Sequence, residues 1–422
     1  MRKYDPTTLY LKPFEMIELP KFELPFFAAL LLLLVLARFF GEIFERMKQP
    51  AMIGEIIAGI ILGPTLLNFI HRTEELKVIS DLGVFLLVIL AGLEINFDDI
   101  LKSMKGRNIV ISLLAFILPI LSGFMIGKLF GQSVMTTVFI GLCVAITALP
   151  VSIRILMDLG KLNTEVGQKI ISVAIFDDVL ALTILGILLD LNHIDKSFSA
   201  ITTATIITGV KLIGFIVVAY ISYRIIQHFS QKENFVENQI DRLLSVLKGK
   251  ESLFALLFMF ILLFATMTES IGLHFIIGSF FASMLLNKKL IGAKNIDLFH
   301  KTTSSMAMGF LAPIFFAGIG LEFKFSAIEN YGLLISIILV SFLSKILGGY
   351  IGGRIANMGH RQSMTLAYGL NARGIMELVI ANIAFREGFI NVEIFSMLVI
   401  MGLITTISTP FLLKQSFHRL KA

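Results

Sequence analysis

The chain has 422 residues, of which 56% are hydrophobic and 16% are charged, and its formal net charge is +6. Soluble domains average about 25% charged residues, so this composition excludes a soluble protein and is typical of one with many membrane-spanning helices. No basic run is interleaved with aromatic residues, which excludes nucleic acid as an expected partner. The single cysteine, Cys143, excludes an internal disulfide and a cysteine-based metal site.

Apolar windows of about 20 residues predict an all-α membrane protein with about thirteen transmembrane helices in a single exchanger domain, 1–422. We place the helices near 22–45, 51–70, 76–97, 105–130, 133–158, 163–192, 200–228, 250–271, 274–289, 298–322, 327–356, 360–387 and 391–418. The first is an extra N-terminal helix.

Loops on the side of the N-terminus hold ten Lys and Arg residues, and loops on the other side hold twenty. The positive-inside rule therefore predicts an outside N-terminus and a cytoplasmic C-terminus, with a bacterial inner membrane as the expected location.

Two short motifs recur along the chain. The pattern at 53–62 returns at 277–286, an offset of 224, and the pattern Gly-Leu-Glu-x-x-Phe at 92–97 returns at 320–325, an offset of 228. These matches indicate two five-helix repeats, 51–192 and 274–418. Seven helices separate their starts, so the repeats are inverted in the membrane, as in many secondary transporters.

The offset of 224 also carries Ala148 onto Ala372, and both lie among helix-breaking residues within apolar segments. Pro150 follows the first, and Gly374 follows the second. Proline removes a backbone donor and glycine loosens a helix, so both segments are expected to be discontinuous and to cross. Unwound backbone at membrane depth requires protein or a water-filled cavity around it.

Asp177 and Asp178 are adjacent in an apolar segment. A carboxylate near the bilayer midplane costs at least about 2.5–3.5 kcal/mol on insertion scales, so such residues usually serve an ion path. Neighbours on a helix point about 100° apart, so one should face a water-accessible cleft and the other a neighbouring helix. Lys345, in the middle of segment 327–356, is the natural countercharge, and Lys211 is a weaker candidate. Burial disfavours a charged carboxylate and an opposite charge favours it, so such a set can trade protons for a cation.

Further polar residues lie beside the two breaks. Thr147, Asn371 and Ser344 have oxygens that suit an alkali cation, whereas no His or Cys cluster suits a transition metal. Arg373 and Glu377 are spaced i, i+4 and are expected to pair with each other or with unwound backbone. Arg154 and Glu55 are expected to have structural roles, and no cofactor is expected.

The chain resembles the monovalent cation/proton antiporter superfamily, in the branch of Kef-type and Nap-type transporters and plant cation/H⁺ exchangers. The resemblance rests on the motifs at 49–64, 90–94, 147–156 and 312–316, on Asp177-Asp178 and Lys345, and on 371–378. It implies a dimerisation domain, a mobile core with crossed discontinuous helices, elevator-like alternating access and a homodimer. It also implies that Asp178 carries the ion and the proton, and that Asp177 pairs with Lys345.

We therefore expect an antiporter that exchanges Na⁺, Li⁺ or K⁺ for H⁺ in competition for Asp178. An aspartate at 177, where the Kef-type and plant proteins often have Asn or Gln, favours Na⁺ or Li⁺ and leaves a Kef-type K⁺/H⁺ antiporter open. A symporter of an organic anion is the less favoured alternative, because it would need basic groups aimed at the substrate. A channel would need a filter ring, which no motif indicates. We expect no enzyme activity, since an aspartyl protease needs carboxylates converging from different helices.

Overall fold

The computed structural model describes residues 24–95, 106–190, 210–211, 214–215, 217–225, 250–286 and 291–421. These parts are all-α and contain no strand. Within them, eight helical stretches are long and apolar enough to cross a membrane. They are α1 (Phe26–Arg46), α3 (Glu74–Glu94), α5 (Asn108–Leu129), α8 (Glu165–Asp190), α11 (Lys250–Ser270), the stretch from α14 to α15 (Ala293–Glu322), α16 (Tyr331–Ile355) and α19 (Val392–Lys421).

Several shorter helices complete the described parts. They are α2 (Ala51–Leu62), α6 (Val134–Ala145), α7 (Leu149–Asp158), α12 (Phe275–Leu285), α17 (His360–Gly369) and α18 (Ile375–Arg386). The expected helix at 200–228 lies mostly outside the described residues, so the count of thirteen stays a prediction. The expected helix at 51–70 is too long: α2 ends at Leu62 because Gly63 and Pro64 follow, and the residue before a proline is driven out of the helical conformation.

The expected helix at 298–322 is also different in the structure. It begins earlier, at Ala293, and it is interrupted by a π-helical turn over Ala307–Leu311 between α14 (Ala293–Met306) and α15 (Ala312–Glu322). Pro313 is in the first turn of α15 and has no N–H to continue the α-helical ladder. A π-helical turn accommodates such an interruption without ending the helix.

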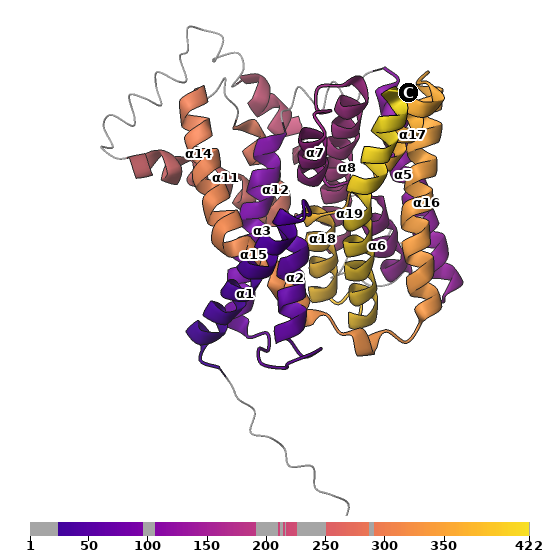
Figure 1. Ribbon diagram of the computed structural model, residues 1–422. Coiled ribbons are helices and arrows are strands. Elements are labelled where there is room, and N and C mark those ends of the chain that lie inside the picture. The colour runs from indigo at the N-terminus through magenta and orange to yellow at the C-terminus, as the bar shows by residue number, and fades with distance from the viewer. Residues whose placement is uncertain are drawn as a thin grey trace, which may run out of the picture.

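The helices form two groups, which lie on opposite sides of Figure 1. We call the first group the panel helices: α1, α2, α3, α11, α12, α14 and α15. α2 packs between α1 and α15, and α3 packs on α12 and α15. We call the second group the core helices: α5, α6, α7, α8, α16, α17, α18 and α19. In this group α5 packs on both α6 and α16, and α17 packs on α16 and α19.

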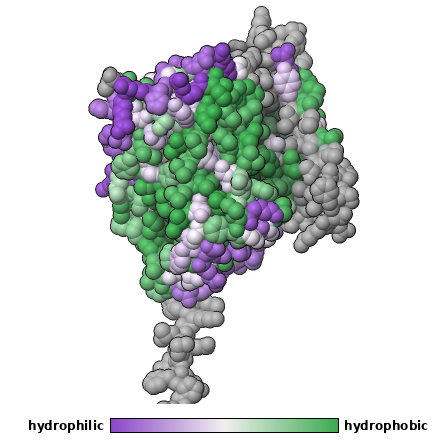
Figure 2. Space-filling view, turned by 90° about the vertical axis from the view of Figure 1, so that its right-hand side faces the viewer, coloured by the Kyte–Doolittle hydropathy of each residue, from purple (hydrophilic) through white to green (hydrophobic). Residues whose placement is uncertain are grey.

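The surface of the protein is apolar around its middle. Figure 2 shows a hydrophobic belt between two hydrophilic ends. Large apolar side chains are exposed along α1, α5, α16 and α19, including Leu31, Leu121, Leu343 and Phe411. A soluble monomer rarely exposes so large an apolar surface, whereas lipid-facing helices require it. The protein is therefore an integral membrane protein.

Candidate ion-binding site

Two breaks in the core helices cross at the centre of the site. The chain is extended at Ile146 and Ala148, between α6 and α7, and a second non-helical stretch joins α17 to α18. The N–H of Ala148 donates to the carbonyl of Ala372 at 2.8 Å. The Thr147 hydroxyl donates to the carbonyl of Leu370 at 3.0 Å. These bonds satisfy backbone groups that the broken helices leave free inside the protein.

Pro150 and Gly374 suit the crossing for different reasons. Pro150 is in the first turn of α7, where its missing N–H would have no helical partner. Gly374 lies where the two breaks approach most closely, since a Cβ atom there would come within 2.8 Å of the Ala148 Cβ and 2.9 Å of Val151 Cγ2. Any larger residue at 374 would push the breaks apart.

Arg373 holds the end of α6. Its guanidinium is fully buried and donates to the carbonyls of Cys143 at 2.5 Å and Ile146 at 2.9 Å, and also to that of Val144. These carbonyls belong to the last turn of α6, where the backbone acceptors have no helical partner and a cation is favoured. The sequence predicted that Arg373 pairs either with Glu377 or with backbone at a break. In the structure its guanidinium binds backbone carbonyls at the end of α6, beside the first break.

Lys345 forms an ion pair with Asp177. The Lys345 Nζ lies 2.7 Å from Asp177 Oδ2, and both side chains are fully buried. The same ammonium donates to the carbonyl of Ala115 on α5 at 3.0 Å and to that of Ala145, the last residue of α6. All three donors of Lys345 are thus used, and Asp177 is joined to the framework of the core helices.

Asp178 has different surroundings from its neighbour. It is also fully buried, but neither of its carboxylate oxygens accepts a hydrogen bond from any residue that the structure describes. Its neighbour Asp177, by contrast, is paired with Lys345. The expectation that one of the two aspartates faces a water-accessible cleft is wrong for this conformation, since both are buried. Of the two aspartates, Asp178 is the one with both acceptor oxygens free, and the buried Glu377 likewise accepts no hydrogen bond from the described residues.

Two adjoining cavities lie between the panel and core helices. The larger, about 530 Å³, is lined by Lys48 and Glu55 of the panel side and by Arg154 and Ile375 of the core side, among others. The smaller, about 110 Å³, contains Glu94 and is called the Glu94 pocket here. The cavities share three lining residues, which are Ser304, Met308 and Ile375. Glu94 itself is exposed, so a carboxylate in the wall of this pocket is in reach of water.

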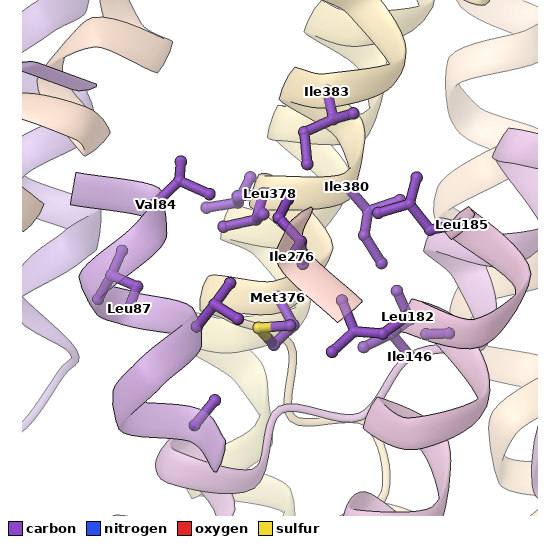
Figure 3. Close-up of a cluster of buried hydrophobic side chains, with 14 of the residues drawn as sticks. Val84, Leu87, Ile146, Leu182, Leu185, Ile276, Met376, Leu378, Ile380 and Ile383 are labelled. Atoms are coloured by element: carbon purple, nitrogen blue, oxygen red, sulfur yellow. The ribbon is translucent and has the colours of Figure 1, made fainter. Parts of the chain in front are cut away.

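An apolar cluster between α3, α8 and α18 borders the Glu94 pocket, since Leu87 and Met376 belong to the cluster and also line the pocket. Figure 3 shows side chains of α3, α8 and α18 converging, with Leu182 beside Met376 and Leu185 beside Ile380. Leu182 and Leu185 follow Asp178 on α8 by about one and two helical turns. All four side chains are buried. A hydrated cation cannot pass such a layer without losing its water, so the cluster is a barrier to ions in this conformation.

The remaining predicted site residues have separate places. Asn371 lies in the second break, where its Nδ2 donates to the carbonyl of Ala367 at 3.0 Å and its Oδ1 accepts no bond from the described residues. The Ser344 hydroxyl instead donates to the Val340 carbonyl of its own helix at 2.6 Å. Glu377 is buried in the first turn of α18, where the helix dipole favours an acid. In the described parts of the chain, no cluster of three or more His, Cys, Asp or Glu residues could hold a metal ion.

Other charged residues lie away from the crossing. Arg154 pairs with Glu45 at 3.0 Å on the rim of the larger cavity, and Glu55 lies 3.9 Å from Arg38 in its wall. Lys211 is helical and interacts with other residues, so it is not a free basic group. Glu94 was not predicted as a site residue from the sequence. Glu94 belongs to the repeated Gly-Leu-Glu motif, which could have marked it as a candidate. The motif alone, however, does not show which residues surround the Glu94 side chain.

Comparisons with known proteins agree with this geometry. Residues 29–415 match the family model described as sodium/hydrogen exchanger, transmembrane. The Na(+)/H(+)-K(+) antiporter GerN of Bacillus cereus is 27% identical over 396 residues, which cover 94% of this chain and 97% of that protein. Cation/H(+) antiporter 20 of Arabidopsis thaliana is 27% identical over 410 residues, which cover 90% of this chain and 47% of that longer protein.

A solved structure shows the same fold. The sodium proton antiporter MjNhaP1 from Methanocaldococcus jannaschii superimposes with a TM-score of 0.66, at 19% sequence identity, and the match covers 92% of this chain and 95% of that one. The family match spans most of the chain, including both breaks and the acidic pair. The chain therefore belongs to the transmembrane sodium/hydrogen exchanger family, a family of secondary-active cation/proton antiporters.

Proposed function

We propose that this antiporter exchanges Na⁺ for H⁺, with Li⁺ or K⁺ as alternative cations, and that Asp178 binds the cation and the proton in turn. The observation that carries the proposal is the contrast between the two aspartates. Lys345 neutralises Asp177, whereas Asp178 keeps both carboxylate oxygens free of hydrogen bonds from the described residues. A buried carboxylate is costly unless a proton or a cation neutralises it, so the two ligands compete for one position.

Oxygen atoms near the crossing can complete a cation site. Asn371 Oδ1 and Asp177 Oδ1 accept no hydrogen bond from the described residues, and unwound backbone carbonyls lie in the same region. Hard oxygen ligands suit an alkali cation better than a transition metal. Thr147 and Arg373 hold the breaks together, while Ser344 supports the helix that carries Lys345. Pro150, Gly374 and Glu377 belong to the discontinuous helices and have supporting roles.

Alternating access would let Asp178 meet each side of the membrane in turn. In this conformation Asp178 is buried and lines neither cavity. Movement of the core helices along the panel helices would open it first toward one side and then toward the other when Asp178 is neutralised. The two inverted repeats expected from the sequence, 51–192 and 274–418, would give rise to inward-open and outward-open states related by a pseudo-two-fold axis.

The protein is expected to form a homodimer in the bacterial inner membrane, with its N-terminus outside and its C-terminus in the cytoplasm. The bacterial relatives and the excess of Lys and Arg on one side support this placement. The exposed apolar face of α1, with Phe27, Leu31 and Val35, supports a panel-side contact between two copies.

Flux in proteoliposomes tests the proposal. With an inside-acid pH gradient, addition of Na⁺, Li⁺ or K⁺ outside should release protons from vesicles with the wild-type protein, and Asp178→Asn should abolish the release. Glu165→Gln is the matched control, because it changes an exposed acid of the same helix that pairs with Lys169 at 2.6 Å. Wild-type exchange by Asp178→Asn would refute the role of Asp178. The ranking of the three ions decides between Na⁺ and a K⁺ antiporter, which the name of GerN keeps open.

A further inference from the structure

A third cavity lies outside the transport path, in a groove between α17 and α19. Its volume is about 350 Å³, and it is lined by His360, Arg361, Met364, Tyr368, Leu412, Gln415, Ser416 and Arg419. None of these residues is acidic. The groove runs about 12 Å along α17, from His360 at the start of the helix to Tyr368. It lies at the end of the molecule where the C-terminus is found (Figure 1).

The polar and apolar linings of the groove are separated along its length. Arg361 and Arg419 are exposed at the outer end, where the Arg361 guanidinium donates to the Arg419 carbonyl at 3.1 Å. His360 is beside them and lies 2.9 Å from the Tyr350 hydroxyl. Met364 and Tyr368 are partly buried further along α17. A ligand that fills the groove must therefore be anionic at one end and apolar at the other.

The charges around the outer end of the groove also favour an anionic ligand. The sequence has no Asp or Glu from Arg354 to Leu370 or from Pro410 to the C-terminal Ala422, and Lys414 adds a further basic group. α8 packs on α17, but the acid of its first turn, Glu165, is paired with Lys169. Both arginines lie at this end of the groove, and guanidinium groups suit the geometry of a phosphate.

The apolar end of the groove continues onto the lipid-facing surface. Ile404, Ile407 and Phe411 are exposed on α19, and their spacing of three and four residues places them on one face with Gln415 of the groove. An acyl chain along this stripe would lead directly to a headgroup in the groove. A soluble phosphate compound would gain nothing from the stripe, so the continuity favours a lipid.

We propose that the groove between α17 and α19 binds an anionic phospholipid, with its phosphate at Arg361 and Arg419 and an acyl chain along Ile407 and Phe411. Basic pockets between transmembrane helices bind anionic headgroups in this way. α17 leads into the second break, at Leu370, so the lipid would brace the short helix that precedes the ion site. This site is separate from the ion-binding residues, so failure of either proposal leaves the other standing.

Thermal unfolding of the full chain in mixed micelles tests the lipid site. Palmitoyl-oleoyl phosphatidylglycerol should raise Tm more than the phosphatidylcholine of the same chains, and Arg361→Gln/Arg419→Gln should lose the difference. Titration should show binding weakened roughly thirtyfold in this variant, since each basic residue near an anionic lipid contributes about fivefold. Lys128→Gln is the control, because it removes an exposed basic residue in the last turn of α5 that does not line the groove.

Three further measurements distinguish a bound lipid from a folding defect and from a soluble anion. The Tm of the double variant in phosphatidylcholine should fall only slightly below that of the wild type, because Arg361→Gln removes one exposed hydrogen bond, to the Arg419 carbonyl; a small fall shows that the substitutions leave the fold intact. If phosphatidylglycerol and phosphatidylcholine stabilise the wild type equally, or the double variant keeps the full difference, the proposal is wrong. If inorganic phosphate or glycerol 3-phosphate reproduces the whole effect and phosphatidylglycerol adds nothing, the ligand is a soluble anion and the lipid assignment is overturned.

Discussion

Ala148 and Ala372 are 224 residues apart, and the N–H of the first donates to the carbonyl of the second at 2.8 Å. Each lies in the break of a different discontinuous helix pair, and the offset of 224 residues is the one at which the motif at 53–62 returns at 277–286. The bond joins the breaks directly, and the Thr147 hydroxyl adds a second bond, to the Leu370 carbonyl. The crossing is therefore a hydrogen-bonded unit, and its disturbance should affect stability and transport together.

Thr147→Val should weaken the crossing. Valine has nearly the shape of threonine but cannot donate to the Leu370 carbonyl, and an unsatisfied buried acceptor costs about 1–3 kcal/mol. We expect a lower Tm in detergent and slower exchange in proteoliposomes. Thr266→Val is the control, since this exposed hydroxyl bonds only within its own helix, to Leu262 at 2.8 Å. Equal Tm values for the two variants would show that the bond at the crossing contributes nothing.

Lys345→Met should destabilise the protein strongly. The substitution leaves Asp177 charged and unpaired inside the protein, at a cost of about 3–5 kcal/mol, and it also removes the donor to Ala115. Asp177→Asn/Lys345→Met should recover much of the lost Tm, because no buried charge remains. A double variant as unstable as Lys345→Met would mean that the lysine acts through the α5 and α6 carbonyls and not through the ion pair.

Glu94→Gln should raise the KM for the cation with a smaller effect on the maximal rate. A carboxylate in the Glu94 pocket concentrates cations near Asp178, so its loss should weaken apparent affinity by about three- to tenfold. The effect should shrink at high ionic strength in choline chloride, where exposed charges are screened. Glu74→Gln, at the other end of α3, is the control and should leave KM unchanged. A reduced maximal rate at unchanged KM would contradict a role in cation attraction.

Gly59→Ala should separate α2 from α15. A Cβ atom at position 59 would overlap the carbonyl of Ala317, so the helices could not keep their close approach. Small residues allow this kind of packing in membranes. Gly309→Ala is the control, since a Cβ atom there meets nothing within 4 Å in the described parts. The first variant should lose several degrees of Tm and the second none, and a similar Tm for both would show that the panel helices adjust freely.

Much of the fold was predictable because membrane helices leave a strong signal in one dimension. Apolar length predicts where a segment spans, and the helix breakers at Pro150 and Gly374 predict where it is interrupted. Helix ends were less predictable. α2 ends at Leu62, well before the end of its apolar run, because local backbone geometry at Gly63 and Pro64 overrides hydropathy.

The site was likewise only partly predictable from the sequence. The cost of buried charge made Asp177, Asp178 and Lys345 candidates from sequence alone, since few other residues lie so deep in apolar segments. Sequence could not assign different partners to the two aspartates. Asp177 contacts Lys345 because α8 and α16 meet around α5, and that meeting depends on packing between segments 168 residues apart. The sequence also could not predict which backbone carbonyls Arg373 binds.

Glu94 and Glu322 show what the sequence predicts and what only the tertiary structure reveals. They occupy matching places in the repeated motif, yet Glu322 pairs with Arg72 while Glu94 lines a pocket. The sequence by itself determined the class of protein, the membrane-spanning character and the residues that are expensive to bury, because these depend on composition and local pattern. Only the tertiary structure decided which acid is paired and which is free, because burial and pairing depend on helices that are distant in the chain.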